Sequence, residues 1–301
     1  MDHQFKNFED SDYEKVRNFL IEISEENRLH INWNWARWEW MYFHPELDKS
    51  LIEKIGLWFC GEELVGVATY DMYPGEGFFA VKKGFEELEN DILEYAVRNF
   101  CNENGLGIAA NDTDDRTIDL LKSHGFVKNE QTENVLELDL NEAVFTANLA
   151  DGITLENIHP EKDVYKHQKV LWKGFDHEGE VPLDQDIVDK QRILLTAPHL
   201  NPLLHVVAKN QHSEYVSYCG LWYDKETDYV YVEPVCTIPE YRNKGIGRAT
   251  VMEALKRAKD LGAKWAYVIS YTDFYDKLGF KPHSHYTFYW YKDKTISERV
   301  K

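Results

Sequence analysis

Three basic residues and two glycines lie close together where a predicted strand runs through a loop into a predicted helix. They are Arg242, Lys244 and Arg248, with Gly245 and Gly247 between them. The first amides of a helix have no acceptor within the helix, and the helix dipole makes this end positive, so it can bind an anion. A glycine carries no Cβ and lets phosphate oxygens approach the backbone. We therefore predict a phosphate or diphosphate site here.

The alternative interpretation of this stretch is a solvated turn before a helix that needs glycine for geometry alone. A helix start without a ligand favours Asp or Glu in its first turn, so three cations there lower stability unless an anion binds. The chain is acidic, with 34 Lys and Arg against 53 Asp and Glu and a formal net charge of -19. Such a local reversal of sign favours the anion site. The spacing fits neither the P-loop nor the dinucleotide motif, although a loop for another nucleotide remains an alternative.

The composition limits the class of protein and its partners. With 301 residues, 43% of them hydrophobic, two globular domains are expected. The net negative charge argues against nucleic acid and against anionic membranes as partners. There is no basic leader at the start and no apolar run of about 18 residues, so we expect a cytoplasmic protein. The cysteines Cys60, Cys101, Cys219 and Cys236 are not spaced for zinc, and we expect them to be reduced and buried, with no metal bound.

The two halves of the chain resemble each other. Leu121-Lys-Ser-His-Gly125-Phe126 recurs about half a chain length later as Tyr275-Asp-Lys-Leu-Gly279-Phe280. Patterning predicts a hairpin over 56–71 and a helix over 86–102 in the first half. In the second half it predicts strands over 203–208, 216–223, 229–237 and 264–270 and a helix over 247–261. The aromatic helix at 32–43 is expected to serve packing rather than a substrate cage.

The spacing Arg242-x-x-Gly245-x-Gly247 after Pro239-Glu-Tyr strongly resembles the acyl-CoA pyrophosphate loop of the GNAT superfamily of N-acetyltransferases. The resemblance continues through the following helix and strand to 273–280. It implies an α+β fold with two GNAT-like domains, each a mixed, mostly antiparallel twisted sheet flanked by helices. The expected domains are a degenerate, non-catalytic one at 1–143, a linker at 144–151, and a catalytic one at 152–301.

The same resemblance implies acetyl-CoA as co-substrate. The family's sheet splays between its fourth and fifth strands, and the pantetheine arm pairs with the fourth like an added strand. Carried onto this sequence, the pantetheine would be bonded by Val235, Cys236 and Thr237. The pyrophosphate would be bonded by Arg242, Asn243, Lys244, Gly245, Ile246, Gly247, Arg248 and Ala249.

The first half departs from this pattern at the equivalent loop. Residues 80–89 hold one glycine, Gly84, followed by Glu86, Glu87 and Glu89. Carboxylates at a helix start satisfy its positive end and repel a pyrophosphate. We infer that this half has lost the cofactor, although two lysines, at 82 and 83, weaken the inference.

Tyr275 lies four residues before Gly279, where the resembled family places the tyrosine that protonates the CoA sulfur. A phenol has a reference pKa near 10 and is protonated at neutral pH; packing alone is the alternative role. Glu233, on the predicted fourth strand, would share a face with Val235 and could take the amine proton through water or hold an ammonium group, but it could equally be paired structurally. Cys236 has no adjacent histidine and is interpreted as a buried residue.

The loop 174–180 follows the first helix of the second half, where the resembled family builds its acceptor pocket. Phe175 and His177 are the candidate acceptor contacts there, with simple solvation as the alternative. The predicted function is transfer of an acetyl group from acetyl-CoA to the primary amine of a small molecule by direct attack. A non-catalytic acyl-CoA sensor or regulatory module is the alternative, and a homodimer is compatible with either.

Overall fold

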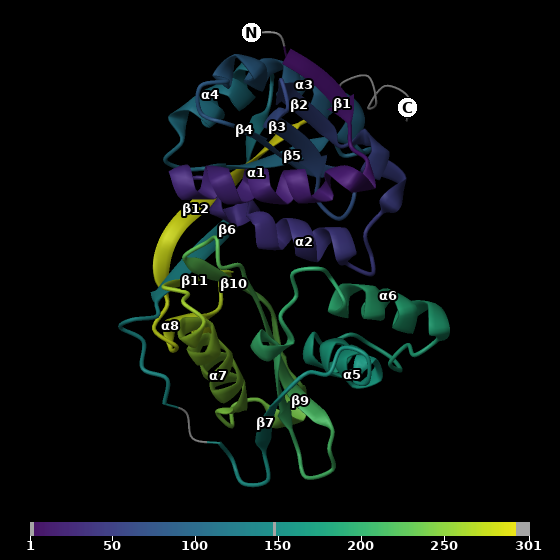
Figure 1. The fold of residues 1–301 in the computed structure, drawn as a ribbon, viewed down its shortest axis with the longest axis vertical. Helices are drawn as coiled ribbons and strands as arrows, with labels where there is room; N and C mark the ends of the chain where they lie inside the picture. Colours follow the sequence, from purple (N-terminus) through teal and green to yellow (C-terminus); the bar gives the residue numbers. More distant parts are fainter. Residues whose placement is uncertain (1–2, 147–148, 293–301) are drawn as a thin grey trace. The chain divides into compact units, whose positions relative to one another are not determined.

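A computed structural model describes residues 3–146 and 149–292, which fold into two compact units (Figure 1). Among the described residues, the first unit comprises 3–42, 46–135 and 284–292, and the second comprises 43–45 and 136–283. The chain therefore passes between the two units after residue 135 and again after residue 283, whereas the sequence suggested a linker at 144–151. The difference arises because the last strand of the chain pairs within the sheet of the first unit.

The first unit is built on a mixed sheet. Its strands are β1 (His3–Asn7), β2 (Gly56–Cys60), β3 (Glu63–Tyr70), β4 (Glu76–Val81), β5 (Leu106–Asn111), most of β12 (Lys281–Tyr291) and the first part of β6 (Val127–Asp139). Its α-helices are α1 (Tyr13–Glu26), α2 (Trp35–Phe43), α3 (Glu89–Phe100) and α4 (Asp115–Ser123). β12 pairs antiparallel with β5 from Tyr286↔Asn111 to Tyr291↔Leu106. β4 and β5 run parallel and pair at Glu76↔Gly107 and Gly77↔Ile108.

Local sequence accounts for much of this unit. The predicted hairpin is β2–β3, turned at Gly61 with a left-handed φ of 63°. The predicted helix is α3, whose apolar residues Ile92, Ala96 and Phe100 are buried as a helical period requires. Trp35 and Trp38 of α2 are fully buried, which confirms core packing for the aromatic helix.

The second unit has a five-strand run in the order β11-β10-β9-β8-β7. The strands are β7 (Thr154–Asn157), β8 (Val206–Lys209), β9 (Tyr215–Tyr223), β10 (Tyr229–Thr237) and β11 (Trp265–Ile269), and the α-helices are α5 (Val164–Gly174), α6 (Gln185–Leu195), α7 (Ile246–Asp260) and α8 (Asp273–Asp276). All neighbouring pairs are antiparallel except β10–β11. This confirms the expected α+β class with a mostly antiparallel sheet flanked by helices.

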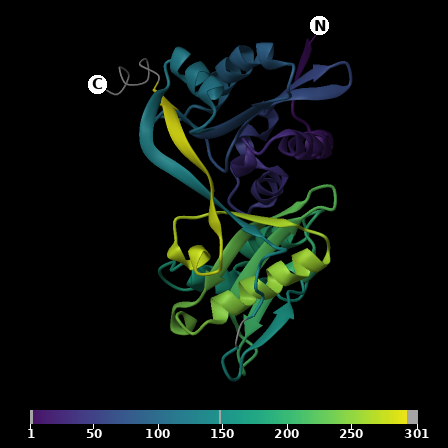
Figure 2. The ribbon, with the colours of Figure 1, turned by 90° about the vertical axis from the view of Figure 1, so that its left-hand side faces the viewer.

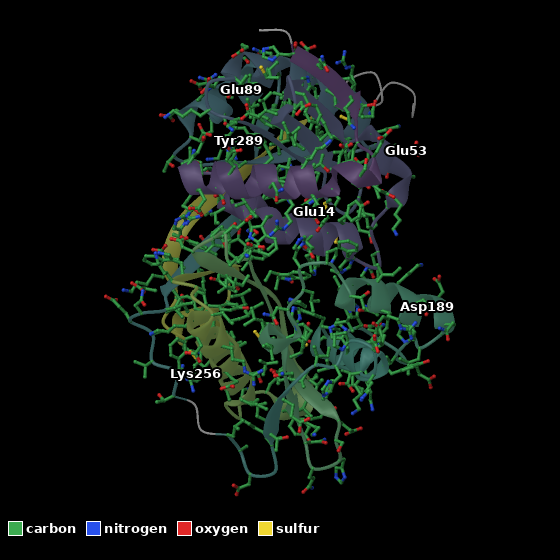
Figure 3. The ribbon with its side chains drawn as sticks, viewed as in Figure 1. Glu14, Glu53, Glu89, Asp189, Lys256 and Tyr289 are labelled. Carbon is green, nitrogen blue, oxygen red and sulfur yellow. The ribbon has the colours of Figure 1, made fainter. Side chains whose placement is uncertain are left out.

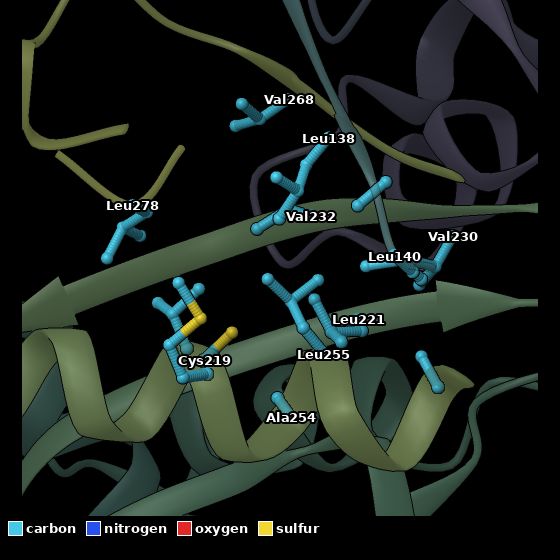
Figure 4. Packing of buried hydrophobic residues seen from close by; sticks show 14 of the residues in the cluster. Leu138, Leu140, Cys219, Leu221, Val230, Val232, Ala254, Leu255, Val268 and Leu278 are labelled. Atoms are coloured by element: carbon cyan, nitrogen blue, oxygen red, sulfur yellow. The ribbon is translucent and has the colours of Figure 1, made fainter. Parts of the chain in front are cut away.

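Two apolar layers hold the second unit together. One packs α7 against the sheet, with Leu255 of the helix against Leu221 and Val232 of the strands (Figure 4). The other lies under α5 and α6 and includes Val170, Val188 and Tyr218. Figures 1 and 2 show α7 on one face of the strands and α5 and α6 on the other. Side chains of β10 therefore enter different layers according to the face on which they lie.

The chain also contains short 3-10 helices. They span Asp10–Asp12, Ile31–Trp33, Lys49–Lys54, Glu86–Leu88, Pro202–Leu204 and Pro239–Tyr241. The last of these, η6, connects the end of β10 to the loop before α7. Since proline has no N–H to donate, it ends the strand ladder at this point.

Candidate active site

Two parallel strands of the second unit, β10 and β11, pair along only part of their length, and we call the region where their pairing ends the wedge. β10 and β11 pair only at Tyr229↔Trp265, Val230↔Ala266 and Tyr231↔Tyr267. β10 continues to Thr237 and pairs there with β9 alone, so along 235–237 its other edge has no ladder partner among the described strands. An unpaired strand edge offers N–H and C=O groups to an extended ligand.

A β-bulge interrupts β10 beside the wedge. Its register to β9 shifts between Val232 and Val235. Val232 and Val235 both pack in the layer under α7 although they are three residues apart, so the simple alternation on which Glu233 was predicted to share a face with Val235 does not hold. Glu233 is half-buried, its carbonyl accepts the Trp222 indole N–H at 2.9 Å, and its charge acts on Tyr275.

The loop between β10 and α7 is shaped by two left-handed residues. Asn243 has φ 59° and Gly245 has φ 76°. Gly245 precedes the first residue of α7, Ile246, and no described side chain caps this helix. The first turn of α7 contains no acidic residue. The first amides of α7 therefore have no cap from a described side chain, which is the geometry that the predicted anion site requires.

The three cations of this loop bond mainly to carbonyl oxygens. Lys244 Nζ donates to the Glu240 carbonyl at 2.7 Å, and Arg248 Nη1 donates to the Lys277 carbonyl at 2.6 Å. Because a carbonyl is neutral, these bonds hold the side chains without cancelling their charge. Lys244 and Arg248 thus keep their positive charge while hydrogen bonds hold their side chains in place.

Arg242 connects the loop to the end of α5. Its Nε donates to the Thr237 carbonyl and its Nη2 to the Gly174 carbonyl, both at 2.8 Å, and its Nη1 pairs with the Asp176 carboxylate at 2.9 Å. Arg242 thus holds the loop against β10 and against the segment expected to line the acceptor pocket. Gly174 and Asp176 belong to the loop 174–180 named from the sequence, but their contact with Arg242 was not predicted, since only the tertiary structure brings them together.

Gly247 is enclosed by the protein itself. A Cβ at this position would lie 2.8 Å from Thr237 Oγ1 and 3.7 Å from the Phe274 ring. The absence of a side chain at 247 therefore has a packing reason besides the approach of a phosphate.

We predict that Gly247→Ala lowers the free energy of unfolding by about 1 kcal/mol. Alanine in a helix is favoured over glycine by up to about 1 kcal/mol, but overpacking costs about 1–3 kcal/mol, so the clash outweighs the propensity. In a Thr237→Ala background the clash is relieved, and the same glycine-to-alanine step should become stabilising. Urea unfolding of the four proteins measures this, and an unchanged sign would exclude the clash.

Tyr275 lies at the inner side of α8. It is 8% exposed and its ring contacts Phe274 and Phe280 edge-on at 5.1 and 5.4 Å. Burial raises the pKa of Tyr275 well above its usual value, and the nearby carboxylate of Glu233 raises it further. The phenol is consequently protonated over the whole neutral range, as a proton donor must be.

The cysteines do not form a nucleophilic site. All four are free thiols, and Cys219 and Cys236 are buried while Cys60 and Cys101 are only partly so, which corrects the expectation that all four are buried. Burial raises the pKa of Cys236 to about 12, so its thiol stays protonated and unreactive. Its Sγ contacts the Val170 carbonyl at 3.5 Å.

The two candidate acceptor contacts lie on the surface of the second unit. Phe175 is 48% exposed, and the exposed His177 stacks on Trp172 with ring centroids 4.6 Å apart. Asp176 between them has a left-handed φ of 58° and is the residue that pairs with Arg242. Within the described residues, no group of three or more His, Cys, Asp or Glu is arranged to hold a metal ion.

In the first unit, the equivalent loop is closed by its own carboxylates. Glu86 Oε1 accepts the Gly84 amide at 3.0 Å, and this and a second backbone hydrogen bond lower the pKa of Glu86. Lys82 forms ion pairs with Glu22 and Glu63, so its charge is neutralised. Lys82 therefore no longer argues against the inference that the first half has lost the cofactor.

The gap between β4 and β5 of the first unit is also filled. Trp33, 2% exposed, stacks on Phe78 of β4 with ring centroids 5.3 Å apart. The cavity that remains between them and β5 has a volume of about 20 Å³, roughly the space needed by one water. An extended cofactor arm does not fit there without displacing Trp33.

Comparison with known protein families finds a match, and it lies within the second unit. The matched residues are 163–280, which contain the wedge, the loop before α7, and α8. They match the acetyltransferase (GNAT) family. This similarity, which covers less than half of the chain, indicates an acyltransferase. No curated protein matches the chain.

Solved structures share the fold at low sequence identity. A tandem GNAT protein from the clavulanic acid biosynthesis pathway superposes with a TM-score of 0.66 at 12% identity, covering 96% of this chain and 98% of that one. A GCN5-related N-acetyltransferase from Sphaerobacter thermophilus gives 0.60 at 11% identity, covering 95% and 94%. An N-myristoyltransferase from Saccharomyces cerevisiae gives 0.59 at 12% identity, covering 96% and 78%. These likenesses establish the GNAT fold. No helix of the described chain is long and apolar enough to span a membrane.

Proposed function

We propose that the chain transfers the acetyl group of acetyl-CoA to the primary amine of a small molecule. The observation that carries this proposal is that the wedge between β10 and β11 opens beside the uncapped, positively charged start of α7. The diphosphate of CoA would bind at residues 242–249, and its pantetheine arm would extend along β10 past Thr237 and Val235. The net charge of -19 favours an acceptor that is a cation in solution.

Val235 is the best placed residue of β10 to pair with the arm. The Ile238 N–H bonds to the Val216 carbonyl of β9, so by strand alternation the backbone groups of Thr237 and Val235 face the wedge. The carbonyl of Thr237 is already bonded by Arg242. The N–H and C=O of Val235 and the N–H of Thr237 therefore supply the backbone pairing.

The proposed chemistry is direct attack. The neutral amine nitrogen bonds to the thioester carbonyl carbon, the carbon–sulfur bond breaks, and the departing thiolate takes the phenol proton of Tyr275. Glu233 takes the proton that the amine loses, through water. The raised pKa of Tyr275 keeps the phenol protonated until the thiolate forms.

A titration with CoA tests the binding site. Arg248→Glu gives α7 an acidic first turn like that of the corresponding helix in the first unit. We expect CoA affinity to fall on the order of 10–100-fold because the new carboxylate repels the diphosphate. Lys256→Glu, on the exposed side of the same helix (Figure 3), makes the same charge change away from the loop and should alter affinity less than threefold. Calorimetry that detects no CoA uptake by the unmodified protein would refute the proposal.

The first unit is proposed to keep the fold without the cofactor. Its loop amide is capped by Glu86 and its gap is filled by Trp33. We therefore predict a stoichiometry of one CoA per chain at saturation, both in the unmodified protein and, with weaker affinity, in the Arg248→Glu variant. Two equivalents bound to the unmodified chain would contradict this assignment.

An acyl-CoA sensor is the second candidate, and the burial of Tyr275 at 8% exposure is the observation in its favour. A sensor binds CoA but releases no thiol. Incubation with acetyl-CoA and a panel of primary amines, with thiol release followed by colorimetry, separates the two. Tight binding without amine-dependent release would select the sensor.

A further inference from the structure

Asp176 occupies a backbone position that favours a different residue. The Asp176 N–H bonds to the Lys173 carbonyl at 3.3 Å, and the His177 N–H bonds to the Trp172 carbonyl at 3.1 Å, so α5 ends in a Schellman motif. Such a motif holds the residue after the cap in the left-handed region, where glycine or asparagine is usual, and Asp176 has φ 58°. A carboxylate there also faces the negative end of the helix dipole. Two local effects therefore disfavour Asp176.

A contact with the loop before α7 offsets these effects. The Asp176 carboxylate pairs with Arg242 Nη1 at 2.9 Å. Of the three cations in that loop, Arg242 is the one paired with a carboxylate in the part of the chain that the structure describes, since Lys244 and Arg248 donate to carbonyls. The two side chains of the pair are 38% and 59% exposed, so a ligand can reach them from solvent.

Arg242 is held in place without Asp176. Its Nε and Nη2 donate to the carbonyls of Thr237 and Gly174, both at 2.8 Å. Gly174 is itself closely packed, since a Cβ there would lie 2.7 Å from Cys236 Sγ. A guanidinium has five N–H groups, so the three described contacts leave two for a further acceptor. Removal of the Asp176 carboxylate therefore leaves the guanidinium positioned and takes away only a negative charge.

The guanidinium lies beside the start of α7. The carbonyl to which its Nε donates belongs to Thr237, and Thr237 Oγ1 is the atom that a Cβ on Gly247 would meet at 2.8 Å. Gly247 lies in the first turn of α7, which no described side chain caps. The Asp176 carboxylate is thus a negative charge at the edge of the proposed diphosphate site. Because like charges repel, it opposes the binding of an anion there.

We propose that Asp176 is a built-in counter-ion of Arg242, which neutralises the guanidinium in the ligand-free protein and weakens CoA binding by competing with the diphosphate. This inference rests on the proposed function, since it requires CoA at the loop. It adds a residue outside that loop which sets the affinity for the cofactor. Because the same cost applies to product CoA, Asp176 favours its release after transfer.

Calorimetric titration with CoA tests this role. Asp176→Asn removes the charge and suits the left-handed backbone, and we expect it to bind CoA about threefold to tenfold more tightly than the unmodified protein. Asp176→Gly, with the usual residue of a Schellman motif, should reproduce the gain. Glu178→Gln removes an exposed carboxylate from the same loop and should change the affinity less than about twofold.

The part played by Arg242 is tested by a double-variant cycle. Arg242→Gln keeps an N–H donor but loses the charge, and we expect it to weaken CoA binding. In this background Asp176→Asn should raise the affinity for CoA less than about twofold, because no guanidinium remains to be neutralised. An undiminished gain would show that the carboxylate acts on the ligand without Arg242 and would overturn the assignment.

Three other results would also overturn the proposal. An unchanged CoA affinity in Asp176→Asn would make the ion pair an ordinary surface contact, and a loss would show that the carboxylate orders the loop for the cofactor. An equal gain in Glu178→Gln would assign the effect to the total charge of the segment. Thermal unfolding shows whether each variant is folded, and Asp176→Gly replaces the asparagine variant if that one is not. If the unmodified protein binds no CoA, the proposed function itself fails, a result distinct from CoA binding that is insensitive to Asp176.

Discussion

Replacing Tyr275 by phenylalanine is expected to lower kcat for acetyl transfer by about 10²- to 10⁴-fold, the usual contribution of a positioned proton donor. Without the phenol, the thiolate must leave unprotonated or take its proton from water. The ring itself stays, with its contacts to Phe274 and Phe280. CoA affinity and the free energy of unfolding should therefore change little. Single-turnover formation of the acetylated amine, measured beside CoA titration, separates the two quantities.

The matched control is Tyr271→Phe, which removes the same group from a residue 60% exposed and should leave kcat within twofold. The pH dependence gives a second check. Since burial raises the pKa of Tyr275 well above its usual value, kcat should not decline between pH 7 and 9.5 through ionisation of this phenol. An unaltered kcat in Tyr275→Phe would remove the residue from the chemistry, and a parallel loss of CoA affinity would assign it to packing.

The second large effect is a loss of stability in mild acid. His167 and His205 are each 1% exposed, and burial lowers the pKa of both from 6.5 to about 3. Below pH 6.5 the unfolded chain binds protons at these residues and the folded chain does not, so stability falls as the pH is lowered from 6.5 toward 3. At pH 4.5 each histidine contributes up to about 2.7 kcal/mol to this loss, or about 5 kcal/mol for the two.

Urea unfolding at pH 7.5, 5.5 and 4.5 measures the effect. His167→Phe removes one of the two groups and should halve the difference in unfolding free energy that the histidines cause. His212→Phe, at an exposed site, should leave the slope against pH unchanged. If His167→Phe and the unmodified protein lose stability in parallel, His167 does not titrate in the predicted way.

Several parts of the site were predictable because they depend on neighbouring residues. The glycine at 245 provides the left-handed turn, Pro239 ends β10, and α7 begins directly after the loop at Ile246. The absence of acids in the first turn of α7, and their presence in the first unit, follow from residue order alone. Pattern therefore predicted the local geometry of both loops, and the binding of an anion at the second one stays a prediction.

Other features depend on segments that are distant in the sequence. Strand periodicity does not reveal the bulge between Val232 and Val235. The regular alternation from which Glu233 was predicted to share a face with Val235 is therefore absent there. Periodicity also does not name the partner of a strand, and β12 pairs with β5 of the first unit although the two are far apart in the chain. Arg242 was predicted as a phosphate ligand, and the structure shows which carbonyls and which carboxylate hold it.

The sequence by itself determined the left-handed turn at Gly245, the start of α7 without acids, and the acids of the corresponding loop in the first half, because helix starts, turns and charge are local properties. The tertiary structure alone decided that the Tyr275 phenol is buried, that Arg242 reaches Asp176, and that the Ser217 and Thr237 hydroxyls lie 2.9 Å apart. Those contacts join separate elements. They exist only once strand pairing and core packing have brought the elements together.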